Sequence, residues 1–120
     1  MKIIFNNLIP FKGYSAINLF GILFVRNEYK ILFNLPANEI RKNRLINHES
    51  IHSKQMKELL WIPYYLWYII EWIFRLFQYK FNSKQAYRNI SFEREAYSNE
   101  SNLDYLKSRK RYSFLKYLKI

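Results

Sequence analysis

The chain lacks cysteine and is poor in acidic residues. Without cysteine it forms no disulfide and offers no thiolate to a metal ion, a composition that fits a reducing compartment. Asp and Glu together number 9 against 20 Lys and Arg, so the formal net charge is +11. An excess of this size indicates an anionic partner, either a membrane surface or a nucleic acid.

The N-terminal stretch also lacks the pattern of a cleavable signal peptide. Asn6, Asn7, Pro10 and Lys12 interrupt its apolar residues, and no small-residue cleavage site follows. Half of the residues are hydrophobic and 20% are aromatic, a composition that argues against disorder because it supplies a large apolar surface to bury. The length of 120 residues then predicts a single domain, residues 1–120, with a core of its own.

Residues 1–35 have the composition of β structure. The apolar run Ala16–Val25 is bounded by turn residues, and Tyr29–Phe33 is a second apolar segment nearby. We expect these two segments to pair as a β hairpin across residues 26–28.

Helical patterns follow this β region. Residues 37–60 contain neither glycine nor proline and predict one long helix. Residues 59–77 form an aromatic-rich apolar helix or helical hairpin, residues 84–100 predict another helix, and residues 101–120 form a basic amphipathic tail. The expected fold class is therefore mainly α with a short N-terminal β hairpin, an α+β domain.

Both histidines of the chain belong to one His-Glu-x-x-His motif, formed by His48, Glu49 and His52. Residues four apart lie on one face of a helix, so both imidazoles can reach a single metal ion. Glu49 lies beside that face, where its carboxylate can take a proton from metal-bound water. The motif predicts a zinc site, and the alternative is two surface histidines on an amphipathic helix.

A catalytic zinc site needs a third protein ligand, which in this chain must be a carboxylate because no other histidine or cysteine exists. Glu93 shares a helical stripe with Ala86 and Ile90, which predicts that it faces inward. Glu95 lies on a separate polar stripe, so we expect Glu95 and Glu100 to be in water. A buried carboxylate needs a partner, and for Glu93 this is either zinc or an Arg or Lys side chain.

The motif at residues 48–52, followed by Glu93-x-x-Ala96, resembles the gluzincin metallopeptidases. It is most similar to integral-membrane members whose third ligand lies in a Glu-x-x-Ala-Asp motif. The chain departs from that pattern at Tyr97, which stands in the position of the aspartate. It also looks like small bacterial His-Glu-x-x-His proteins in which glutamine follows at the position of Gln55.

This resemblance implies a minimal zincin-like domain and zinc-dependent hydrolysis of a peptide or protein substrate. Carried over by position, His48, His52 and Glu93 would be the Zn²⁺ ligands and Glu49 the general base. By the same analogy, the apolar run Ala16–Val25 would supply an edge strand for an extended peptide.

The apolar segment 59–77 is close to the roughly 20 residues that cross a bilayer. A single crossing would, however, place His48 and Glu93 on opposite sides of the membrane, and both flanks of the segment are basic. A zinc site therefore requires an in-plane helix, a re-entrant hairpin bent at Pro63, or a core helix. The many Trp and Tyr residues favour a membrane interface. We expect a membrane-associated protein at the cytoplasmic face of a bacterial inner membrane.

Two other functions fit parts of the sequence. A zinc-stabilised, membrane-associated binding or scaffold protein would need the metal ligands but no general base. A nucleic-acid-binding module, which we favour less, would use the basic and aromatic residues of the tail. These tail residues are Lys107, Arg109, Lys110, Arg111, Tyr112, Phe114, Lys116, Tyr117 and Lys119. They suit anionic lipid at least as well.

The sequence gives no indication of an oligomeric state.

Overall fold

Three N-terminal strands form a small mixed sheet in the computed structural model, which describes all 120 residues. The strands are β1 (Lys2–Asn6), β2 (Ala16–Leu19) and β3 (Ile22–Arg26), and their order in the sheet is β1-β3-β2. β1 pairs with β3 in parallel, and β2 pairs with β3 in antiparallel orientation. β2 is therefore an edge strand whose outer side pairs with no other strand.

The hairpin lies within the apolar run, which corrects the pairing expected from the sequence. The chain turns at Phe20 and Gly21, both of which have positive φ, as a two-residue hairpin turn requires. The expected partner, residues 29–33, is instead helical: a 3₁₀ turn (Asn27–Tyr29) leads into α1 (Lys30–Asn34). The glycine inside the apolar run permits this early turn, so β2 and β3 pair with each other.

The two long helices form where the sequence predicts them. α2 spans Glu39–Glu58, preceded by a 3₁₀ turn at Pro36–Asn38, and α3 spans Ile62–Gln78. Pro63 lies in the first turn of α3, where its missing N–H breaks no helical hydrogen bond. The proline therefore begins a helix and does not bend a hairpin. The helices of this protein do not have the length and apolar character needed to cross a membrane.

The helix expected over residues 84–100 is divided into α4 (Ser83–Arg88) and α5 (Ser91–Asn99). The break has a clear cause in α3. The buried carboxylate of Glu71 accepts hydrogen bonds from the backbone N–H of Ser91 at 2.5 Å and from its hydroxyl at 2.6 Å. A carboxylate at this position caps the N-terminus of α5 and fixes where that helix begins.

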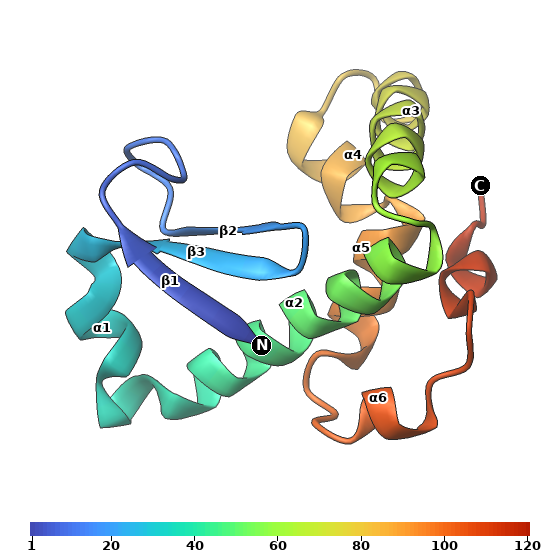
Figure 1. Cartoon of the computed structure of the whole chain (residues 1–120). Coiled ribbons are helices and arrows are strands. Elements are labelled where there is room, and N and C mark those ends of the chain that lie inside the picture. Colours follow the sequence, from blue (N-terminus) through green and yellow to red (C-terminus); the bar gives the residue numbers. More distant parts are fainter.

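The C-terminal tail contains α6 (Tyr105–Ser108) and a 3₁₀ helix (Ser113–Tyr117). It closes the main core, whose buried members are Met56, Tyr64, Ile90, Phe92 and Phe114. In Figure 1, α2 runs diagonally below the sheet, and α3, α4 and α5 gather around its C-terminal end. The fold is mainly helical with a small sheet, and this confirms the α+β class.

Candidate metal centre

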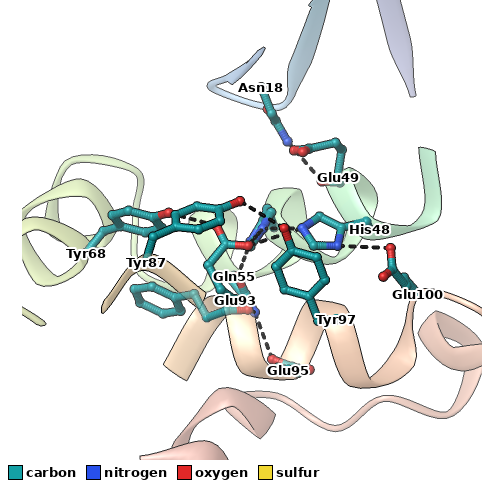
Figure 2. Close-up of polar contacts among 12 residues, drawn as sticks. Asn18, His48, Glu49, Gln55, Tyr68, Tyr87, Glu93, Glu95, Tyr97 and Glu100 are labelled. Carbon is teal, nitrogen blue, oxygen red and sulfur yellow. Dashed lines mark hydrogen bonds and ion pairs between the residues drawn. The ribbon is translucent and has the colours of Figure 1, made fainter. Parts of the chain in front are cut away.

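Two helices bring the three predicted metal ligands together. α2 carries His48 and His52 one turn apart, and α5 carries Glu93 opposite them. His48 Nε2 lies 3.2 Å from Glu93 Oε1, His52 Nε2 lies 3.1 Å from the same oxygen, and the two Nε2 atoms are 3.1 Å apart. Each of the three residues is at most 5% exposed. The three side chains therefore form one compact, buried cluster, and Figure 2 shows His48 beside Glu93.

The other ring nitrogen of each histidine has its own partner. His52 Nδ1 lies 2.8 Å from Gln55 Oε1. The amide nitrogen of Gln55 donates to the backbone carbonyl of Phe92 and to Glu95 Oε1, which leaves the amide oxygen to face the histidine. Because that oxygen can only accept, His52 Nδ1 must carry a proton. The neutral ring then presents the lone pair of Nε2 to the cluster.

His48 is oriented by a carboxylate on its far side. Its Nδ1 lies 3.4 Å from Glu100 Oε2, and Figure 2 shows Glu100 across the ring from Glu93. Metal-bound histidines commonly direct their second ring nitrogen to a carboxylate or carbonyl in this way. Tyr97 has no carboxylate, and it packs its ring 4.6 Å from the His48 ring. The carboxylate beside His48 comes instead from Glu100.

The geometry of the cluster fits a metal ion. With both histidines protonated on Nδ1, three lone pairs converge from His48 Nε2, His52 Nε2 and Glu93 Oε1. Such an arrangement is repulsive unless a cation lies among the three atoms. Zinc bonds of about 2.0–2.1 Å in tetrahedral geometry place neighbouring ligand atoms about 3.3 Å apart. The observed separations of 3.1–3.2 Å are close to that value.

The pKa shifts within the cluster also indicate that positive charge is stabilised there. Burial alone lowers the pKa of His52, but the Glu93 carboxylate outweighs burial and raises this pKa to about 9. Burial raises the pKa of Glu93, and the two histidines outweigh it and hold that pKa well below its ordinary value. Without a metal, the cluster therefore holds a proton at neutral pH. A metal ion bound by the two Nε2 atoms and Glu93 would displace that proton.

The second carboxylate oxygen of Glu93 is held by α3. Tyr68 donates a hydrogen bond of 2.7 Å from its hydroxyl to Glu93 Oε2. Burial and the neighbouring carboxylate raise the pKa of Tyr68, so its hydroxyl remains a donor at neutral pH. Glu93 is thus oriented with one oxygen on the tyrosine and the other directed at the histidines.

Glu49 lies beside this cluster in a cavity of about 330 Å³. The cavity is bounded by strand β2 and by tyrosines of α3 and α4, and His52 and Glu93 form part of its wall. Asn18 of β2 holds the sheet on the motif helix by donating to the backbone carbonyl of Glu49 at 2.9 Å (Figure 2). The Glu49 carboxylate itself accepts no hydrogen bond within the protein, so it is free to act on a molecule in the cavity.

Glu95 is not in water, which corrects the expectation from its helical stripe. It is fully buried between α2 and the tail. Gln55, Tyr105 and Arg109 donate hydrogen bonds to its carboxylate, and these bonds outweigh burial and lower its pKa. α5 is covered on more than one side, so its polar stripe is also buried, and Arg109 supplies the compensating charge from far along the chain.

Glu100 is also not fully solvated, because its carboxylate lies against His48 with a side-chain exposure of 21%. The other contacts that the sequence did not reveal come from Gln55 and Tyr68. Gln55 offered one local signal, since it follows His52 by three residues on the same helix. Tyr68 lies among many aromatic residues of α3 and offered none.

No protein-family model, curated protein or solved structure matches this chain.

Proposed function

We propose that the protein is a zinc-dependent metallopeptidase of gluzincin type that hydrolyses peptide bonds at or near a membrane. One observation carries the proposal. The converging lone pairs of His48, His52 and Glu93 adjoin a cavity that also contains the unengaged carboxylate of Glu49. A general base beside a metal site is the arrangement that metal-assisted hydrolysis needs.

In this mechanism the bound zinc would supply Lewis acidity toward the scissile carbonyl. His48, His52 and Glu93 would hold the ion, and Gln55 and Glu100 orient the two imidazoles. Glu49 accepts a proton from the attacking water while the water oxygen bonds to the carbonyl carbon. The same carboxylate then donates that proton to the amine nitrogen as the C–N bond breaks.

The edge strand supports a peptide as the substrate. β2 lines the cavity with Ala16, Ile17, Asn18 and Leu19, and its outer side pairs with no other strand. An extended peptide can add to such an edge through backbone hydrogen bonds. A substrate bound there would pass along the cavity beside Glu49.

Tyr87 is the side chain best suited to stabilise negative charge on the carbonyl oxygen. It lines the cavity, and its hydroxyl contacts only the hydroxyl of Tyr97, at 3.3 Å. Burial and Glu93 raise the pKa of Tyr87, which keeps the hydroxyl protonated and able to donate. Tyr68 is less suited because it already donates to Glu93.

The proposal is tested by comparing wild type with Glu49→Gln against a library of unstructured peptides, with cleavage followed by mass spectrometry. Glutamine keeps the shape of glutamate but cannot accept the proton. We expect cleavage to fall by about 10²-fold or more while zinc content is unchanged. Glu39→Gln, an exposed change at the start of the same helix, is the matched control and should cleave normally. Tyr87→Phe should reduce cleavage and keep zinc.

Retention of cleavage by Glu49→Gln would reject the hydrolytic mechanism. If wild type binds zinc but cuts no peptide, the zinc-stabilised scaffold becomes the better description. The nucleic-acid alternative is weakened by Arg109, whose side chain is only 4% exposed and pairs with Glu95 and Glu58. A buried guanidinium cannot contact phosphates.

A further inference from the structure

Helix α3 has its charged and apolar residues on unexpected sides. Its only charged side chains, Glu71 and Arg75, are 6% and 1% exposed. The side that faces solvent is apolar, and its residues are between 46% and 68% exposed. Surface helices normally show the opposite distribution. These residues, which we call the α3 outer face, are Leu66, Ile69, Ile70, Ile73, Phe74 and Phe77.

The apolar surface continues beyond the helix. Phe81 follows α3, is 67% exposed, and packs its ring 5.1 Å from that of Phe77. On another side, Leu118 and Ile120 of the tail join the outer face in lining a groove of about 540 Å³. A large exposed apolar patch of this kind commonly marks a site of interaction with another protein or with a membrane.

Exposed cations border this patch. Lys80 lies between Phe77 and Phe81 in the chain, and Lys119 lies between Leu118 and Ile120. Both lysines are exposed, and the whole chain carries a formal net charge of +11. An apolar face with cations at its margin fits a surface that is apolar inside and negatively charged at its boundary.

We propose that the α3 outer face docks on an anionic lipid bilayer, with α3 lying in the plane of the membrane. The 17 residues of α3 give it a length of about 25 Å, and in-plane insertion buries the apolar side while the buried Glu71 and Arg75 stay within the protein. The net charge favours this surface over a second copy of the chain, because two such copies repel each other. The inference rests on the membrane location proposed above and is independent of the peptidase chemistry.

Docking would fix the position of the candidate metal centre relative to the bilayer. The inward side of α3 carries Tyr64 and Tyr68, which contact His52 and Glu93 at 3.4 and 2.7 Å. One helix thus presents its outer side to lipid and its inner side to the cluster. The substrates reached in this geometry are peptide segments that emerge from, or lie along, the same membrane surface.

The test is co-sedimentation of the full chain with vesicles of phosphatidylcholine alone or mixed with phosphatidylglycerol. We expect binding to the anionic vesicles that weakens with added salt and is far weaker on neutral vesicles. Ile70→Asp and Phe77→Asp should each reduce binding by about tenfold or more. Ile40→Asp, a change at an 82% exposed isoleucine of α2, is the matched control and should bind as wild type does.

Circular dichroism and thermal unfolding show whether each variant keeps its fold. Absence of wild-type binding, equal binding to neutral vesicles, or equal loss in Ile40→Asp would each overturn the proposal. So would a dimer in the absence of lipid that Ile70→Asp and Phe77→Asp both dissociate. His48→Ala should still bind vesicles, so a failure of the zinc proposal is distinguishable from a failure of docking.

Discussion

The side-chain oxygen of Gln55 lies 2.8 Å from Nδ1 of His52, and the amide nitrogen of the same glutamine donates to the buried Glu95. Glu95 in turn accepts from Arg109 of the C-terminal tail. A chain of hydrogen bonds therefore runs from the tail to a candidate metal ligand. Its effect is to fix which nitrogen of His52 faces the cluster.

Gln55→Leu should weaken zinc binding by about 10- to 100-fold, because the His52 ring loses the acceptor that sets its tautomer and orientation. The affinity can be measured by competition with a chromophoric chelator. Gln85→Leu is a suitable control, since Gln85 is exposed and its side chain makes no hydrogen bond. Equal affinity of wild type and Gln55→Leu would show that the contact does not orient the ligand.

Glu95→Ala should lower the free energy of unfolding by about 3 kcal/mol, because it removes a partner of the buried Arg109 and an acceptor of Gln55. Zinc affinity should fall as well. Urea denaturation of the metal-free protein measures the first effect, with the exposed Glu39→Ala as control. A loss no larger than in the control would mean that Glu95 is solvated after all.

Zinc and protons should compete for the cluster. The pKa of His52 is raised to about 9 from 6.5, so its protonation stabilises the metal-free fold fully below about pH 6.5 and this contribution is lost as the pH rises through 9. Between about pH 6.5 and pH 8.5 the metal-free protein should lose on the order of 2 kcal/mol from this residue. Zinc needs the deprotonated ring, so the stabilisation that it adds should grow over the same interval.

Thermal unfolding with zinc and with a chelator at both pH values measures this difference. His52→Ala removes the titrating group and serves as the control, so its metal-free stability should change less with pH. A metal-free protein that becomes more stable toward pH 8.5 would contradict the proton in the cluster.

The sequence predicted which three candidate ligands would come together, because their placement depends on local periodicity. His48 and His52 share a face of α2 for the reason that any residues four apart do. The stripe argument also placed Glu93 inward correctly, although the helix that it assumed is broken before Ser91. Because Glu93 lies within α5, beyond the break, it still faces α2 as the stripe predicted.

The failures at Glu95 and at the break before α5 involve partners that are distant in the sequence. Glu95 was expected in water because its counterion, Arg109, belongs to a tail whose path no local pattern reveals. The break before α5 depends on Glu71 in another helix. The hairpin was misplaced for a different reason: the single Gly21 inside an apolar run was a turn signal of modest strength.

The central claim is that His48, His52 and Glu93 together hold one zinc ion, and the metal content of the purified protein tests it most directly. After exposure to zinc and dialysis, elemental analysis should find about one zinc per wild-type chain. His48→Ala, His52→Ala and Glu93→Ala should each hold far less, while Glu39→Ala should match wild type. A folded wild-type protein that retains no zinc, or a Glu93→Ala variant that retains it fully, would contradict the claim.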